Sequence, residues 1–263
     1  MKHIGVKIGA VLAVFVAGMA VLSLFYTPYA YNEMEPSRRF TAPGAAHFMG
    51  TDNFGRDVFS RVMIGGRYTL AVAAITVLAS AGAGGSLGLI SGYAGGVGDE
   101  LLMRLMDALS SFPGILAALA LVSLMENTPF TLITALFVLF VPSYMRIMRS
   151  GMLQYKNANF VKTAEVMGAS HFRIIFLHIL PNLTAPLLSA TALGLSNAIL
   201  AEATMSYLGL GIQPPIPSWG RMLSESQNFL FNAPWCALAP GCMIMLTVIA
   251  FHNISEGIQQ KFF

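Results

Sequence analysis

Charged residues are scarce in this chain of 263 residues, where Asp, Glu, Lys and Arg make up 10% of the sequence, against about 25% in an average soluble domain. Because 56% of the residues are hydrophobic, a water-soluble globule would lack the polar surface to cover itself, whereas a chain dissolved in lipid needs none. Disordered chains are excluded too, since they are rich in charge and poor in apolar residues. The net charge of +3 does not indicate a nucleic-acid partner. We therefore expect a membrane protein.

Cysteine is almost absent as well, with Cys236 and Cys242 the two in the chain. Two cysteines cannot build a disulfide framework, and their spacing is not that of a metal-ligand pair. Both lie in an apolar stretch, so we expect buried structural thiols.

Several catalytic and coupling motifs are missing. No stretch matches Gly, four residues, Gly, Lys, Ser or Thr, so we expect no ATP hydrolysis by the chain itself. The five histidines lack the His-Glu-x-x-His spacing of a zinc protease, and we expect no metal site and no catalytic residue. Arg104, Asp107 and Glu202 lie near the ends of apolar stretches, whereas an ion-coupled carrier would place several ionisable groups at mid-depth.

Six stretches free of Asp, Glu, Lys and Arg are each long enough to cross a membrane as a helix. They are Ile8–Asn32, Tyr68–Gly98, Ala108–Met125, Asn127–Met145, Ile174–Ala201 and Ser226–Ser255. The third and fourth are separated by Glu126 at the turn Glu126–Pro129, which predicts a tight helical hairpin. The fold class is therefore an all-α polytopic membrane protein with six transmembrane helices, whose two termini lie on the same side.

The basic residues predict the orientation. The loop after the fourth stretch holds five of them against Glu165, namely Arg146, Arg149, Lys156, Lys162 and Arg173, and the N-terminus holds Lys2 and Lys7. Cytoplasmic segments are enriched in Lys and Arg, so we expect this loop and both termini in the cytoplasm. The outer segment 33–67 carries five arginines against this rule. A cleaved signal peptide is the alternative for the first stretch, but its apolar run Ile8–Phe25 is longer than a signal core.

The second stretch has an internal repeat. Gly84, Gly88, Gly92 and Gly96 recur every four residues and so share one face of a helix. Small residues on one face allow another helix to approach closely, so we expect a helix-packing surface here.

The cytoplasmic loop predicts two short helices joined by a turn. We expect Asn159 to cap the first, with Phe160, Val161, Ala164 and Met167 on one face. Gly168 would end it and Ser170 would cap the second, which carries Phe172, Ile175, Phe176 and Ile179 before the fifth stretch. Two interpretations are open: an amphipathic hairpin that covers the bundle, or a knob that docks into a cytoplasmic protein.

Residues Phe160–Ser170 and His178–Asn182 resemble the Glu-Ala-Ala loop of the membrane subunits of ATP-binding-cassette importers. Ala164, Gly168, Leu180 and Pro181 match that pattern in register, while Lys162, Thr163 and His178 depart from it. Such departures are of the sort seen in the peptide and nickel branch of the family.

Three further stretches resemble the same branch. They are Gly50–Arg61 with Gly66-Arg67, Met103–Asp107 with Ser111-Phe112-Pro113, and Glu202–Pro215 with Pro217–Gly220. Together they follow the order of the family from about Gly50 to Phe251. The resemblance is to the second of the two permeases in dipeptide, oligopeptide or nickel importers.

The resemblance implies a non-catalytic permease that works with a second permease, two cytoplasmic ATPases that bind ATP and Mg, and an external solute-binding protein. It places the chain, without a cofactor of its own, in the cytoplasmic membrane of a bacterium or archaeon. The implied parts are the first helix with the outer segment (1–67), a permease core (68–256) that contains the coupling loop (146–181), and a short cytoplasmic tail (257–263). An ion-coupled carrier working alone is the alternative.

The resemblance also assigns residues to two surfaces. Those implied in coupling to the ATPases are Phe160, Val161, Ala164, Glu165, Gly168, Ala169, Leu180 and Pro181. Those in the outer-loop motifs are Gly50, Thr51, Asp52, Gly55, Arg56, Asp57, Arg61, Gly209, Gly211 and Trp219.

The charged residues of the outer segment have two interpretations. Asp52, Arg56, Asp57 and Arg61 either bind the solute-binding protein or hold the segment together by ion pairs, and the structural role is favoured. Glu202 either neutralises an outer arginine, which is favoured, or lines the path of a cationic solute.

Overall fold

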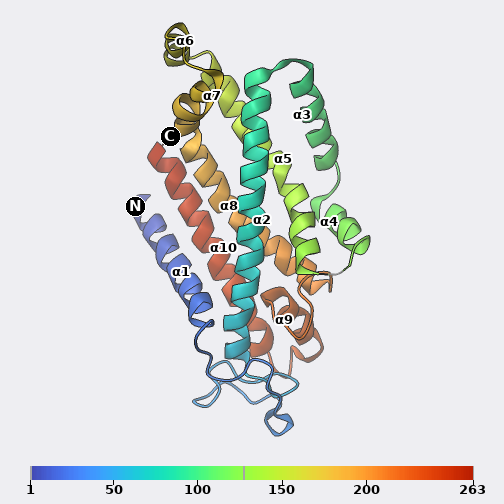
Figure 1. The fold of residues 1–263 in the computed structure, drawn as a ribbon. Helices are drawn as coiled ribbons and strands as arrows, with labels where there is room; N and C mark the ends of the chain where they lie inside the picture. The colour runs from blue at the N-terminus through green and yellow to red at the C-terminus, as the bar shows by residue number, and fades with distance from the viewer. Residues whose placement is uncertain (1, 127, 263) are drawn as a thin grey trace.

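The structure is a computed structural model that describes residues 2–126 and 128–262, and these residues confirm an all-helical fold (Figure 1). In place of a sheet there is one isolated bridge between Thr51 and Asp57. The long helices are α1 (Lys2–Leu22), α2 (Val58–Ala94), α5 (Pro129–Lys156), α8 (Leu180–Tyr207) and α10 (Trp235–Phe262). Each contributes a segment long and apolar enough to cross a membrane.

The shorter elements connect these helices. They are η1 (Pro36–Arg38), α3 (Gly96–Ser110), α4 (Gly114–Ser123), α6 (Asn159–Val166), α7 (His171–Arg173), the π-helical segment η2 (Ile174–Ile179), α9 (Trp219–Ser226) and η3 (Gln227–Phe229). Three predicted boundaries shift. Helix α2 begins before residue 68 because Asp57 caps it at Val58. Helix α5 runs on into the predicted coupling loop, and α10 runs through the predicted tail to Phe262.

The predicted span at Ala108–Met125 is not one continuous helix: the stretch is divided between α3 and α4, which are bent by 87°. Pro113 explains the break: it has no N–H to donate, and it disfavours a helical backbone at Phe112. The described residues thus contain five spans, or six if the bent pair is one span. The predicted turn at Glu126–Pro129 includes residue 127, which lies outside the described residues.

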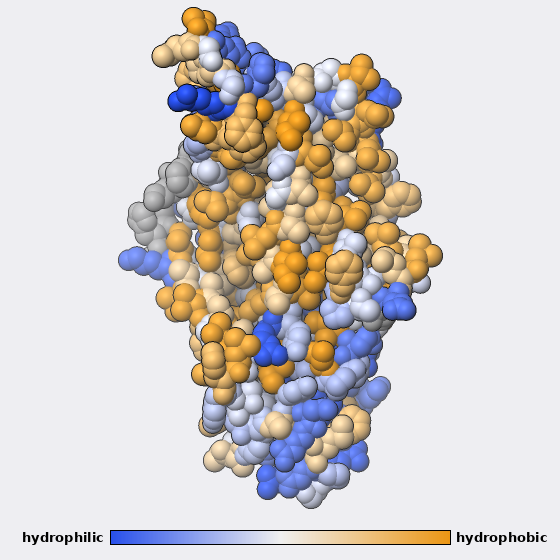
Figure 2. Space-filling model, in the orientation of Figure 1, coloured by the Kyte–Doolittle hydropathy of each residue, from blue (hydrophilic) through white to orange (hydrophobic). Residues whose placement is uncertain are grey.

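The helices form an elongated bundle with polar ends. Helix α2 packs along α5, while α10 packs against both α8 and α1. The segment between α1 and α2 lies at one end with α9, and α6 lies at the other end, toward which α1 begins and α10 finishes (Figure 1). Apolar side chains cover the middle of the surface, and hydrophilic ones gather at the ends (Figure 2). This distribution matches a helical bundle that spans a lipid bilayer.

The glycine repeat of α2 is confirmed as a packing face against α5. A Cβ added at Gly84 would lie 2.5 Å from the carbonyl oxygen of Val141, and one at Gly88 would overlap the carbonyl oxygen of Met145. Gly92 approaches the side chain of Met152. Gly96 does not belong to this face, because α2 ends at Ala94 and Gly96 opens α3 with a φ of +70°.

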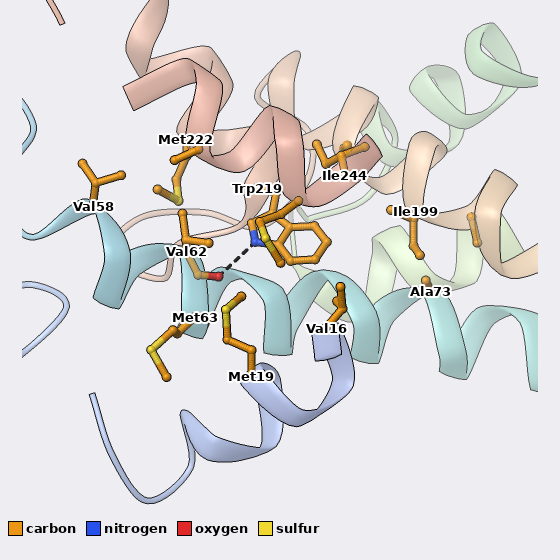
Figure 3. Packing of buried hydrophobic residues seen from close by; sticks show 14 of the residues in the cluster. Val16, Met19, Val58, Val62, Met63, Ala73, Ile199, Trp219, Met222 and Ile244 are labelled. Atoms are coloured by element: carbon orange, nitrogen blue, oxygen red, sulfur yellow. Dashed lines mark hydrogen bonds between the residues drawn. The ribbon is translucent and has the colours of Figure 1, made fainter. Parts of the chain in front are cut away.

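Trp219 joins α9 to α2 at the end opposite α6. Its side chain is fully buried, and its indole Nε1 donates to the carbonyl oxygen of Val62 at 2.9 Å (Figure 3). A Cβ at Gly66 would lie 2.7 Å from the indole ring, so only glycine leaves room there. The cluster around the indole draws side chains from α1, α2, α8, α9 and α10 (Figure 3), among them Met19, Ile199 and Ile244. One aromatic residue therefore fixes the end of the bundle opposite α6.

The prediction for the cysteines is half right. Cys236 is buried near the start of α10, but Cys242 is exposed on the same helix. An apolar stretch does not say which side of a helix faces the bundle when lipid covers the other side.

We predict that Gly88→Ala lowers the midpoint of thermal unfolding in detergent. The added methyl group meets the backbone of α5, and such overpacking costs about 1–3 kcal/mol. Gly82→Ala is the matched control, because its Cβ has nothing within 4 Å on the same helix and should leave the midpoint unchanged or slightly higher. Equal midpoints for the two variants would contradict the close contact of α2 with α5.

Candidate functional site

The loop between α5 and α8 forms the first candidate surface. Helix α6 begins at Asn159 and its N-cap is Ala158, whose side chain makes no capping hydrogen bond, so the predicted cap at Asn159 is wrong. Because Asn159 already has a helical backbone, it lies one position too late to cap the helix.

The predicted end of α6 is confirmed in detail. Gly168 has a φ of +78°, its N–H donates to the carbonyl of Glu165 at 2.9 Å, and the N–H of Ala169 donates to Ala164 at 3.0 Å. These two bonds form a Schellman motif, in which glycine adopts the left-handed conformation without strain. Ser170 then caps α7, as predicted, with its Oγ accepting from the N–H of Arg173. The turn therefore fixes the angle between α6 and the helix that follows.

The buried face of α6 is narrower than predicted. Val161 and Ala164 are buried among residues of α5, η2 and α8, but Phe160 is 42% exposed and Met167 is 81% exposed. Met167 follows the last helical residue and so turns away from the bundle. Together with Val166 it forms an exposed apolar tip that the bundle does not cover.

The other residues assigned to this surface lie on either side of the turn. Glu165 is exposed and Ala169 is half-buried. Leu180 and Pro181 open α8 directly after η2, the former half-buried and the latter exposed. Among the residues of the second short helix, Ile175 and Ile179 are buried whereas Phe172 is 69% exposed.

The loop is attached to the bundle by contacts that the sequence did not reveal. The hydroxyl of Tyr93, near the end of α2, lies 2.6 Å from Nδ1 of His171, and the ammonium group of Lys156 donates to the carbonyl of Tyr93. Below them, Asp99 of α3 pairs with Arg149 of α5 at 2.6 Å. No spacing pattern connects these residues along the chain, so only the folded structure could identify them.

The second candidate surface lies at the opposite end, where four buried or half-buried charged residues form the outer ion network: Asp52, Arg56, Arg61 and Glu225. Asp52 accepts from Nε of Arg56 at 2.6 Å, and Glu225 of α9 accepts from Arg56 at 3.2 Å and Arg61 at 3.0 Å. The burial of Asp52, Arg56 and Arg61 favours their role in holding the outer segment together. Glu225 was missed by sequence reasoning.

Asp57 has a local role at the start of α2. Its carboxylate accepts from the N–H of Ser60 at 2.8 Å and lies 2.8 Å from Nδ1 of His47. It therefore caps α2 and fixes the turn that precedes it. Within that turn Gly50 and Gly55 have positive φ angles, and the carbonyl of Thr51 accepts from the indole of Trp235.

Glu202 does not neutralise an arginine, so the favoured interpretation is wrong for the described residues. It is fully buried in α8, where its carboxylate accepts from the hydroxyl of Ser206 at 2.6 Å. That hydroxyl in turn accepts from the N–H of Ile212 at 3.1 Å. A Cβ at Gly211 would lie 2.5 Å from Cα of Ser206, and Gly209 turns the chain with a φ of +83°. The Glu202–Ser206 pair therefore anchors the loop that leads to Trp219.

Comparisons with known proteins agree with this architecture. Residues 84–263 match the family described as "Binding-protein-dependent transport system inner membrane component". The dipeptide transport system permease protein DppC of Alkalihalophilus pseudofirmus is 40% identical over 241 residues, which cover 92% of this chain and 79% of that protein. DppC of Haemophilus influenzae is 37% identical, with 97% and 88% covered. The glutathione transport system permease protein GsiD of Pectobacterium atrosepticum is 35% identical, with 98% and 86% covered.

We predict that Glu225→Gln destabilises the end of the bundle opposite α6 by roughly 2–4 kcal/mol, because it leaves two buried guanidinium groups with less negative charge than they need. Hydrogen exchange of residues 50–61, measured by mass spectrometry in detergent, should accelerate. Glu100→Gln is the matched control: Glu100 pairs with Arg104, but both side chains are more than half exposed, and such pairs contribute about 1 kcal/mol or less. Unchanged exchange in Glu225→Gln would contradict a structural role for the network.

Proposed function

The chain belongs to the family of binding-protein-dependent transport system inner membrane components, and from this premise we propose that it imports short peptides as one of a pair of permeases. Membership makes the chain a multi-pass, non-catalytic permease of an ATP-binding-cassette importer, with ATPase and binding-protein partners. The alternative of an ion-coupled carrier working alone is set aside, because a binding-protein-dependent system draws its energy from partner ATPases.

The proposed solute is a short peptide. The most similar relatives described above are named for dipeptide or glutathione transport, and glutathione is itself a small peptide. Nickel, the other solute of the branch, finds no counterpart among those names. The second permease of the pair is proposed as a homologous chain that completes the membrane part of the importer.

We place the contact with the ATPases on the tip of α6. The observation that supports it is an exposed apolar tip, Val166 and Met167, next to a turn whose backbone is fixed at Gly168. An apolar knob on a rigid support fits the general mode in which a helix docks into a groove of a partner. Val161 and Ala164 would hold α6 against the bundle, while Glu165 and Phe160 would contact the ATPase at the rim.

The same assignment sets the orientation. Helix α6 and both chain ends lie toward one end of the bundle (Figure 1), and the basic residues of the loop favour the cytoplasm. The outer ion network then faces outward, with α9 presented to the binding protein. Leu180 and Pro181, at the start of α8, would carry movement of the loop directly into a spanning helix.

Reconstitution tests the proposal as a whole. In proteoliposomes that hold this chain, the second permease and both ATPases, with the binding protein added outside, we expect ATP-dependent uptake of labelled dipeptide. Omission of any one partner should abolish it, and Ni²⁺ should not accumulate. Uptake by this chain alone, driven by an ion gradient, would overturn the proposal.

We predict that Gly168→Val abolishes the stimulation of ATP hydrolysis by loaded binding protein without preventing insertion of the chain. A β-branched residue resists the left-handed backbone that the turn requires, although a Cβ there would meet nothing within 4 Å. Gly168→Asn is the matched control, since asparagine tolerates that conformation, and it should retain most of the stimulation. Full stimulation in Gly168→Val would show that the geometry of the turn is not needed.

A further inference from the structure

A cavity of about 280 Å³ lies where α4, α5 and α8 meet. Most of its wall is apolar, but Ser143 of α5 and Asn197 of α8 also line it. Ser143 lies midway along α5, and Asn197 lies ten residues before the end of α8, about 15 Å along the helix. Both residues therefore lie near the middle of their helices, far from either end of the bundle, although their side chains are exposed.

A second hollow, of about 720 Å³, lies between α5 and α8 closer to α6. Its lining is more polar and includes Ser150, Gln154 and Asn182. The two hollows follow one another along the same pair of helices. One reaches the middle of the bundle, and the other lies at the end proposed to be cytoplasmic.

A single stripe of α5 connects the hollows. Ser143 lines the first, while Ile147, Ser150 and Gln154 line the second, and their spacing of four, three and four residues keeps them on one helical face. Asn182, Pro186 and Asn197 fall on one face of α8 by the same geometry. These residues define the α5–α8 stripe.

Four polar side chains of this stripe lack the hydrogen bonds that most polar side chains of the spans make; Asn182, which donates to the carbonyl of His178, is the exception within the stripe. Within the described residues, the side chains of Ser143, Ser150, Gln154 and Asn197 are exposed and have no hydrogen-bond partner. By contrast, Thr134, Thr191, Thr204 and Thr247 each donate to the carbonyl four residues earlier. A polar side chain left unpaired against lipid is costly, so these groups are expected to meet water, a solute or a partner chain.

We propose that the α5–α8 stripe is this chain's half of the translocation path, with the amide of Asn197 and the hydroxyl of Ser143 as hydrogen-bonding groups for a peptide backbone at mid-depth. The solute class rests on the proposed function, whereas the location of the path does not. An amide and a hydroxyl each donate and accept, so they pair with both the N–H and the C=O of a passing peptide without requiring a particular side chain. The rest of the cavity wall is apolar and offers few hydrogen-bonding groups to the peptide. Weak binding of this kind would favour release of the peptide.

The exposed face of α2 shows what a lipid-facing surface of this chain looks like. Ile75, Leu78 and Ile90 are more than half exposed and carry no polar atoms in their side chains. Among the exposed side chains of α2, the small hydroxyl of Ser86 is the one polar group. The α5–α8 stripe, at comparable depth, interrupts its apolar residues with amides and hydroxyls. The exposed face of α2 thus carries a single hydroxyl, whereas among the described residues the stripe carries two amides and two hydroxyls that are exposed and unpaired, which favours contact with water or solute over lipid.

Thiol accessibility tests the location. In a Cys236→Ser, Cys242→Ser background that still transports, Asn197→Cys and Ser143→Cys should each react with a membrane-impermeant methanethiosulfonate in the assembled importer, because the reagent needs a hydrated thiolate. Leu78→Cys is the matched control at similar depth and should stay unmodified. The proposal is overturned if neither Asn197→Cys nor Ser143→Cys reacts. That result would mean that lipid or a dry contact with the second permease covers both positions.

Transport kinetics test the role of the amide. Asn197→Leu in the intact complex should lower dipeptide uptake about fivefold, the effect of one lost hydrogen bond, while stimulation of ATP hydrolysis by the binding protein is retained. Unchanged uptake would remove Asn197 from the path. If the wild-type importer moves no peptide at all, the proposed solute fails, yet the accessibility result still locates the path.

Discussion

Every charge in this protein must either be paired or be kept out of lipid, and the structure follows from that constraint. The helices satisfy their own backbones and leave an apolar surface across the middle of the bundle. The remaining charges gather at its two ends. At one end Asp52, Arg56, Arg61 and Glu225 pair across the chain, and at the other Asp99 pairs with Arg149. Both clusters fix the relative positions of the helices that they join, because apolar packing alone does not specify how far one helix is shifted along another.

Specific close contacts then determine how the helices meet. Gly84 and Gly88 bring α2 against the backbone of α5, where dispersion contacts rather than the hydrophobic effect hold helices together in lipid. Trp219 has the same function at the outer end, since it is large, fully buried and hydrogen-bonded to Val62. The result is a closely packed frame around α2, to which the two polar surfaces are attached.

Helix α8 connects the proposed sites to each other. It begins at the π-helical segment behind the loop of α6, carries Asn197 on the α5–α8 stripe, and holds Glu202 beneath the loop that leads to Trp219. A displacement of α6 would therefore be transmitted by α8, one continuous helix, to the middle of the bundle and to the end opposite α6. If α6 contacts the ATPase and the stripe lines the path, as proposed, α8 connects the two sites physically.

The all-helical membrane fold, the close face of α2 and the turn at Gly168 could be read from the amino-acid order, because hydropathy, glycine spacing and turn chemistry are local properties. The family was recognised from the resemblance of four motifs. The break at Ser111–Pro113 was missed although its proline is a local signal for a helix end, because the apolar run was given more weight. The exposed tip at Met167 depends on how α6 packs and had no such signal. Which charges pair depends on the folded arrangement: Arg61 and Glu225 are 164 positions apart, and no sequence pattern relates residues at that separation. The folded arrangement also determines which polar side chains remain unpaired, because the neighbours of a helical face are known only once the other helices have packed.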